Sequence, residues 1–141
     1  METKPLNADI SVSVQILPNE VAELKAAGFK SIINNRPDGE VDGQPTSAMM
    51  AEAASAQGLA YRHIPVVPGH LTDADAAAMA EALASMPKPV LAFCRSGTRS
   101  THLWALSQAG SCDVSELLLA ARAQGYDISA LAPKLSAAHK A

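Results

Sequence analysis

Short strand-like segments and helical segments alternate along the chain, and this alternation restricts the fold more than any other feature of the sequence. Apolar residues at every second position of 10–16 predict a half-buried strand. The continuous apolar run at 89–93 is typical of a strand covered on both faces. The other expected strands lie at 30–35 and 60–67, and the expected helices at 18–28, 47–57, from Thr72, 100–108, 113–125 and after Asp127. This order favours an α/β fold with a mostly parallel central sheet flanked by helices.

The size and charge of the chain narrow the functional classes. At 141 residues the sequence predicts a single domain over 1–141, with its core at about 10–135. A net charge of -3 provides no basic field, so neither nucleic acid nor a membrane surface is an expected partner. No apolar run reaches the length of a membrane span, and residues 1–13 lack the apolar region of a secretory signal. With two cysteines, the sequence indicates a cytoplasmic, reducing location.

One segment carries candidate chemistry, namely Cys94 and the loop that follows the buried run at 89–93. Ligands of open α/β sheets bind beyond the carboxyl ends of the strands, which is where this loop lies. Gly97 lets backbone N–H groups point into one hollow, and the helix that follows contributes its positive N-terminal end. Together with Arg95 and Arg99, these features favour the thiolate form of Cys94.

The sequence therefore assigns a nucleophile and an anion site. Cys94 and Arg99 are the predicted catalytic residues. The anion-binding residues are predicted to be Arg95, Ser96, Gly97, Thr98 and Ser100. The histidines and cysteines share no metal-ligand spacing, so no metal and no cofactor are expected. The expected ligand is a small anionic sulfur or phosphate compound.

The segment CRSGTRS resembles the active-site loops of cysteine-dependent phosphatases and of rhodanese sulfurtransferases. Cys94 and Arg99 enclose four residues, one fewer than in tyrosine and dual-specificity phosphatases, which matches the rhodanese length. The loop alone thus favours the rhodanese resemblance.

The rest of the chain resembles the dual-specificity phosphatase scaffold instead, through SVSVQI, SIINNRPDGE, YRHIPV and PVLAFC in that order. It is most similar to the small bacterial phosphatase-like family named after the β-lactamase hydrolase-like proteins, from about Ile10 to Leu135. This resemblance implies a tyrosine/dual-specificity-phosphatase-like fold and sulfur handling. Some members are fused to a persulfide dioxygenase, which makes such an enzyme an expected partner.

A proton donor for a leaving oxygen is missing from the place where phosphatases carry it. The resemblance implies an Asp just after the strand at 61–67, but Val67-Pro68-Gly69 stands there. His70 and Asp73 are nearby candidates for the acid. Asp38 is a candidate for bracing the loop, and its alternative role is a Pro-Asp-Gly turn. Cys112 is either a resolving thiol or a half-buried structural cysteine.

Sulfur transfer needs fewer groups than phosphate-ester hydrolysis. Sulfite or a thiolate departs without a strong proton donor, so the short loop and the missing acid both favour it. The leading expectation is a sulfurtransferase that forms a Cys94 persulfide from thiosulfate or a low-molecular-weight persulfide. A cysteine-dependent phosphatase is the first alternative, and a non-catalytic anion-binding or sulfur-relay module is the second.

Overall fold

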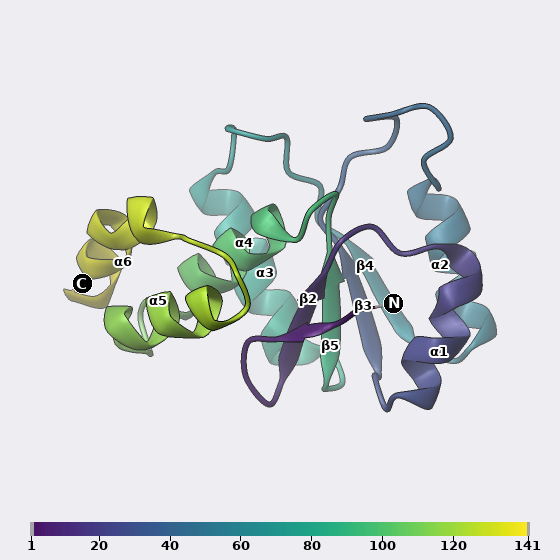
Figure 1. Ribbon diagram of the computed structural model, residues 1–141, viewed down its shortest axis with the longest axis horizontal. Coiled ribbons are helices and arrows are strands. Elements are labelled where there is room, and N and C mark those ends of the chain that lie inside the picture. The colour runs from purple at the N-terminus through teal and green to yellow at the C-terminus, as the bar shows by residue number, and fades with distance from the viewer. Residues whose placement is uncertain (1, 141) are drawn as a thin grey trace.

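A five-stranded sheet runs through the middle of the molecule, with helices on both of its faces (Figure 1). The computed structural model describes residues 2–140. The strand order is β1-β2-β5-β3-β4, with β1 antiparallel to β2 and the other neighbours parallel. The expectation of a mostly parallel sheet flanked by helices is confirmed.

The elements follow one another in nearly the predicted order. The strands are β1 (Lys4–Pro5), β2 (Ile10–Ser13), β3 (Ser31–Asn34), β4 (Ala60–His63) and β5 (Val90–Phe93). The helices are α1 (Val21–Ala26), α2 (Ser47–Ala56), α3 (Asp73–Ser85), α4 (Thr98–Gln108), α5 (Val114–Ala123) and α6 (Ala132–Lys140), with short 3-10 turns η1 (Pro18–Glu20) and η2 (Ser129–Leu131). Only β1 is unanticipated, because a two-residue edge strand is too short to carry a hydrophobic period.

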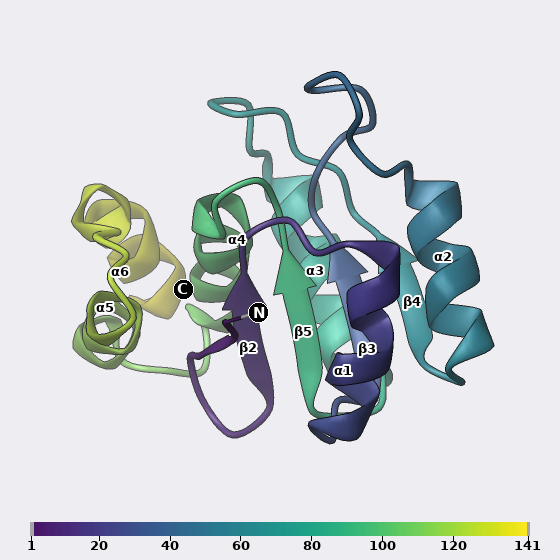
Figure 2. The same ribbon diagram turned by 45° about the vertical axis from the view of Figure 1, so that its right-hand side comes forward.

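The two faces of the sheet have separate hydrophobic clusters. On one face α1 and α2 pack against Ile32, Leu91 and Phe93 (Figure 2). On the other face, α3 and α4 cover Ile33 and Ala92. Successive residues of β3 and β5 thus point into opposite clusters, as the alternation of side chains along a strand requires.

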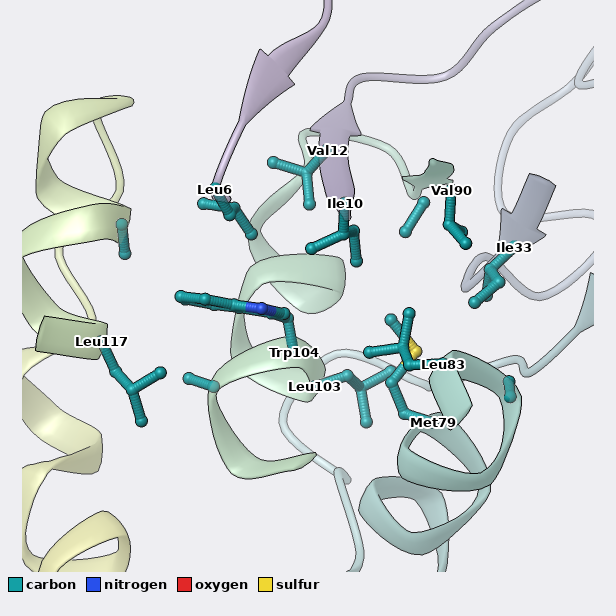
Figure 3. Packing of buried hydrophobic residues seen from close by; sticks show 14 of the residues in the cluster. Leu6, Ile10, Val12, Ile33, Met79, Leu83, Val90, Leu103, Trp104 and Leu117 are labelled. Atoms are coloured by element: carbon teal, nitrogen blue, oxygen red, sulfur yellow. The ribbon is translucent and has the colours of Figure 1, made fainter. Parts of the chain in front are cut away.

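The second cluster extends away from the sheet to α5 and α6. Figure 3 shows Trp104 of α4 between Leu6 near the N-terminus and Leu117 of α5, with Met79 on α3. Burying a large apolar side chain such as Leu117 stabilises the fold by about 1.5–3 kcal/mol. This packing fixes α5 and the chain that follows it against α4.

Two of the expected strands are shorter than predicted. The strand expected over 10–16 ends at Ser13 and is buried on both faces, so the half-buried prediction is wrong. Small serines at alternate positions let a covering layer approach the face that looked polar in the sequence. The strand expected over 60–67 ends at His63, because Pro65 lacks the N–H needed for a regular ladder.

Helix starts agree with the capping chemistry. The helix expected from Thr72 is α3, and Thr72 and Asp75 form a reciprocal capping box at its start. Helix α4 begins at Thr98, two residues earlier than expected, with Gly97 as its N-cap. The loop after Cys94 is therefore even tighter than the sequence indicated.

Candidate active site

The carboxyl ends of the four parallel strands lie level with one another. Ser13 of β2, Phe93 of β5 and Asn34 of β3 are register partners, and Asn34 pairs in turn with His63 of β4. The loops that follow these strands therefore leave the sheet at one edge. Cys94, directly after the central strand β5, lies in the middle of that edge.

Cys94 is buried, and its sulfur accepts a hydrogen bond from the backbone N–H of Gly97 at 3.0 Å. The loop turns back on itself because Gly97 has a φ of +90°, in the left-handed region. Helix α4 starts at the next residue, so its N-terminal end faces the sulfur. This arrangement stabilises negative charge at Cys94 and on a bound anion.

Tyr126 covers the outer side of this loop and was not predicted. Its hydroxyl donates a hydrogen bond to the Ser96 carbonyl oxygen at 2.9 Å, and a Cβ placed on Gly97 would lie 2.1 Å from the same hydroxyl. Burial, together with the charge of Cys94, raises the pKa of Tyr126 above its ordinary value of 10. Tyr126 follows α5, far along the chain, so no local pattern could have revealed it.

Arg99 points back from the first turn of α4 toward the strand ends. It forms a bidentate ion pair with Glu40, at 2.7 Å through Nη1 and 2.9 Å through Nη2. Nη1 also donates to the Val66 carbonyl oxygen at 2.8 Å. Burial alone would lower the pKa of Arg99, but Glu40 and the charge of Cys94 outweigh it and raise that pKa.

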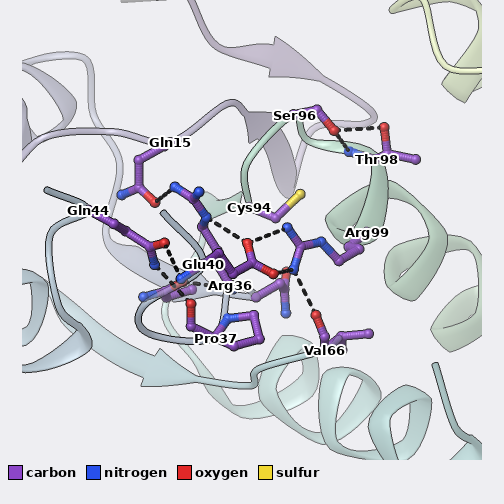
Figure 4. A network of polar contacts seen from close by, with 12 residues as sticks. Gln15, Arg36, Pro37, Glu40, Gln44, Val66, Cys94, Ser96, Thr98 and Arg99 are labelled. Atoms are coloured by element: carbon purple, nitrogen blue, oxygen red, sulfur yellow. Dashed lines mark hydrogen bonds and ion pairs between the residues drawn. The ribbon is translucent and has the colours of Figure 1, made fainter. Parts of the chain in front are cut away.

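Glu40 lies between two arginines, as Figure 4 shows. Its Oε1 also accepts from Arg36 Nε at 2.7 Å, and Arg36 Nη1 donates to Gln15 Oε1 at 3.1 Å. The hydrogen bonds from Arg99, opposed by burial and supported by Arg36, hold the pKa of Glu40 below its ordinary 4.5. Glu40 is therefore a carboxylate at neutral pH.

This network explains the NRPDGE segment. Arg36 is only 3% exposed, and its backbone is also fixed, because Asn34 Oδ1 accepts its N–H and His63 Nε2 donates to its carbonyl oxygen. The spacing of Arg36 and Glu40 was visible in the sequence. The sequence did not indicate that the side chain of Glu40 contacts Arg99.

The polar side chains of the loop mostly brace it. Ser100 is buried and donates to Asn35 Oδ1 at 2.8 Å, while Asn35 Nδ2 donates to the Ile64 carbonyl oxygen. The Ser96 hydroxyl donates to the Thr98 hydroxyl at 3.0 Å. The structure thus brings the predicted loop residues together, and it gives Ser100 a link to β3 rather than an open hydroxyl.

Arg95, which was predicted to bind the anion, and the candidates for support or acid lie further out. Arg95 is exposed, and its carbonyl oxygen accepts from the Gln15 N–H at 3.3 Å. Asp38 Oδ1 accepts the Ser47 N–H at 2.7 Å, at the start of α2, instead of contacting the loop. Asp73 is exposed and pairs with Lys134 at 3.3 Å.

No acid among the described residues contacts the loop apart from Glu40, which the arginines occupy. His70 is exposed in the turn after Val67, and its backbone N–H donates to the Val67 carbonyl oxygen. Neither His70 nor Asp73 is bonded to Cys94 or Arg99 within the part of the chain that the structure describes. Among the residues that the structure describes, no free acid therefore contacts the loop to protonate a leaving oxygen.

Neither a metal site nor a membrane-spanning helix is found in the described part of the chain. Among the side chains that the structure describes, no three from His, Cys, Asp or Glu lie close enough together to bind a metal ion. None of the described helices has the length and apolar character required to span a membrane.

A family model and curated proteins match the sequence of this chain. The family model of the beta-lactamase hydrolase-like protein, phosphatase-like domain, matches residues 2–111. The beta-lactamase hydrolase-like protein of Agrobacterium fabrum is 36% identical over 132 residues, which cover 92% of this chain and 31% of that protein. The chain thus spans about a third of the length of the curated relatives it matches.

Solved structures share the fold. A Neisseria meningitidis protein, named as a candidate phosphatase, has a TM-score of 0.83 and 29% identity, covering 95% of this chain and 96% of its own. Kinase-associated phosphatase, solved with its catalytic-site cysteine replaced by serine, has a TM-score of 0.71 at 15% identity, covering 90% of this chain and 83% of its own. The tyrosine/dual-specificity-phosphatase-like fold is confirmed.

Proposed function

The chain belongs to the phosphatase-like domain family of the beta-lactamase hydrolase-like proteins, and on this premise we propose that it is a cysteine-dependent sulfurtransferase. The Cys94 thiolate is the nucleophile and the carrier of the transferred sulfur. The loop 95–99 and the N-terminal end of α4 hold the anionic donor. Thiosulfate and low-molecular-weight persulfides are the proposed donors.

The observation that carries this proposal is the state of Glu40. In a phosphatase the leaving alkoxide needs a proton from a nearby acid. Glu40 is the carboxylate at the loop, but it is ionised and both of its oxygens are bound to arginines. Sulfite and thiolates are stable anions that leave without such a proton, so sulfur transfer suits this site better.

The transfer takes two steps. The Cys94 thiolate attacks the outer sulfur of thiosulfate, forming a new S–S bond, while the old S–S bond breaks and its electron pair leaves with sulfite. Cyanide or a thiolate then attacks the outer sulfur of the Cys94 persulfide. The electron pair of that bond returns to Cys94 as the thiolate, and thiocyanate or a new persulfide is released.

Turnover of thiosulfate and cyanide, compared with turnover of an aryl phosphate, tests the reaction. We expect thiocyanate formation with a kcat/KM above that for the aryl phosphate, and loss of both activities in Cys94→Ser. Cys112→Ser is the matched control, because Cys112 lies beyond the far end of α4, about 15 Å away at 1.5 Å per helical residue. Better turnover of the aryl phosphate would overturn the proposal.

A phosphatase is the second candidate, and the names of the structural neighbours favour it. It requires a proton donor, for which His70 and Asp73 are the proposed sources. In that case His70→Ala or Asp73→Asn lowers turnover of alkyl phosphates far more than of aryl phosphates, whose leaving groups need less protonation. From their exposed positions we expect both variants to act like the wild type.

Mass spectrometry of Cys94 after mixing with thiosulfate separates sulfur transfer from sulfur relay. A persulfide that forms and is discharged by cyanide supports the enzyme. A persulfide that forms once and is not discharged supports a relay module that works with a separate persulfide dioxygenase.

A further inference from the structure

Apolar side chains surround the candidate active site. Six large hydrophobic side chains are exposed among the described residues, and four of them lie on the loops that follow β2, β3 and β4. These four, here called the apolar rim, are Val14, Leu17, Val41 and Val67, and they are between 40% and 54% exposed. The strands that precede them end level with Phe93, so the rim lies at the same edge of the sheet as Cys94.

Each loop that carries a rim residue is also bound to the centre of the site. In the first loop Gln15 accepts a hydrogen bond from Arg36, and in the second Glu40 pairs with Arg99. In the third the Val66 carbonyl oxygen accepts from Arg99. Every rim residue is one or two positions along the chain from one of these contacts. The rim residues therefore lie on the segments that also contact the anion site.

The positive charge inside the site is already partly compensated. Glu40 pairs with both Arg36 and Arg99. Glu40 also takes two of the five N–H donors of Arg99, and Val66 takes a third. A dianion entering this site meets less positive charge than two free arginines would offer. The binding free energy of a singly charged ligand is reduced less by this compensation, because its interaction with the arginines is weaker than that of a dianion.

We propose that Glu40 and the apolar rim select donors that carry one negative charge and an apolar body, such as the persulfide of an aliphatic or aromatic thiol. This inference rests on the proposed sulfur transfer for its reaction and adds the substrate class. The terminal sulfur lies at Cys94, and the apolar body packs against the rim. Thiosulfate, with two charges and no apolar body, is then a donor that binds less tightly than such a persulfide.

The transfer from such a donor balances without a further reactant. The Cys94 thiolate attacks the terminal sulfur of the anion R–S–S⁻, forming the Cys94 persulfide anion. The S–S bond of the donor breaks, and its electron pair leaves on R–S⁻.

Three non-transferable anions test the selection without turnover. Sulfate has two charges, methanesulfonate has one, and benzenesulfonate has one charge and an apolar ring. Each is measured by the concentration that halves the rate of Cys94 alkylation by iodoacetamide, in a Cys112→Ser background. We expect benzenesulfonate to protect at about one tenth of the methanesulfonate concentration. Sulfate should protect no better than methanesulfonate, and the reverse order would overturn the proposal.

Substitutions test separately whether the apolar rim selects the apolar body and whether Glu40 selects the charge of the ligand. Val14→Thr and Val67→Thr keep the side-chain shape and should each reduce the advantage of benzenesulfonate over methanesulfonate about threefold. Leu119→Gln is the matched control, because Leu119 is an exposed apolar residue on α5, outside the rim. Glu40→Gln should shift the ratio of sulfate to methanesulfonate protection toward sulfate by about three- to tenfold.

The outcomes keep this proposal separate from the proposed reaction. Protection in the expected order without any sulfur transfer supports the ligand selection and overturns the proposed reaction. Sulfur transfer with sulfate as the best protector leaves the reaction standing and overturns the selection. A loss of sulfate protection in Glu40→Gln would show that Glu40 only positions Arg99. If Glu40→Gln does not fold, the wild-type series decides by itself.

Discussion

Gly97 is the residue on which the geometry of the anion site depends most. Its backbone adopts a φ of +90°, which directs its N–H to Cys94 Sγ and allows α4 to start at Thr98. Its missing side chain is equally important, because the Tyr126 hydroxyl occupies the space where a Cβ would lie. Backbone conformation and close packing therefore both require glycine at this position.

Gly97→Ala is expected to impair both stability and Cys94 reactivity. The left-handed conformation costs an alanine about 1–2 kcal/mol, and the contact with Tyr126 adds to it. Gly28→Ala is the matched control, since Gly28 has a φ of +100° but no atom near its Cβ position. Chemical unfolding and iodoacetamide alkylation measure the two effects. Equal losses of stability in both variants would show that the Tyr126 contact is unimportant, and Tyr126→Phe should partly rescue Gly97→Ala.

At the scale of elements, α2 and α3 begin with side-chain caps. The Thr46 hydroxyl accepts the Met49 N–H at the start of α2, and Asp38 accepts the Ser47 N–H. Helix α3 begins in the same way, with Thr72 and Asp75. Asp38 was a candidate for bracing the Cys94 loop, but its contact in the structure is with α2.

Asp38→Ala is therefore expected to reduce stability without changing Cys94. Loss of a capping interaction typically lowers the free energy of unfolding by about 0.5–2 kcal/mol. Asp75→Ala should have a similar effect through α3 and serves as the comparison. Urea unfolding measures the stability, and the alkylation rate of Cys94 measures the site. A tenfold fall in that rate for Asp38→Ala alone would show that Asp38 supports the loop after all.

For the whole molecule, the ion pairs of Glu40 join segments that are far apart in the sequence. Glu40 connects the loop after β3 to α4 through Arg99, and Arg36 extends the connection through Gln15 to the loop after β2. The side chain of Glu40 is only 17% exposed, and that of Arg36 only 4%. Removing the carboxylate leaves two largely buried arginines without their partner, which should cost about 2 kcal/mol at pH 7.

This network also predicts how stability depends on pH. Because Arg99 and Arg36 lower the pKa of Glu40, the folded state holds its carboxylate ionised where the unfolded chain binds a proton. Its contribution is fully present above the ordinary pKa of 4.5 and is lost as pH falls through the lower folded value. Urea unfolding between pH 7 and pH 3 should show a steeper loss for the wild type than for Glu40→Gln. Glu23→Gln, at an exposed position of α1, is the control and should follow the wild type.

Sequence alone was enough to predict the order of the elements, the buried strand before Cys94 and the four residues that separate Cys94 from Arg99. These features depend on side-chain periodicity, on caps such as Thr72 and on turn residues such as Gly97, which act over a few neighbouring positions. They were therefore visible in the order of the residues.

The partner of Arg99 and the residue that covers the loop depend on the tertiary structure. Glu40 and Arg99 are 59 positions apart, and Tyr126 and Ser96 are 30 apart. Their contacts exist because parallel strands end level at one edge of the sheet and because α5 packs against α4. No local pattern encodes which of several charged loops meet there, so the partner of Arg99 is fixed only when the whole chain has folded.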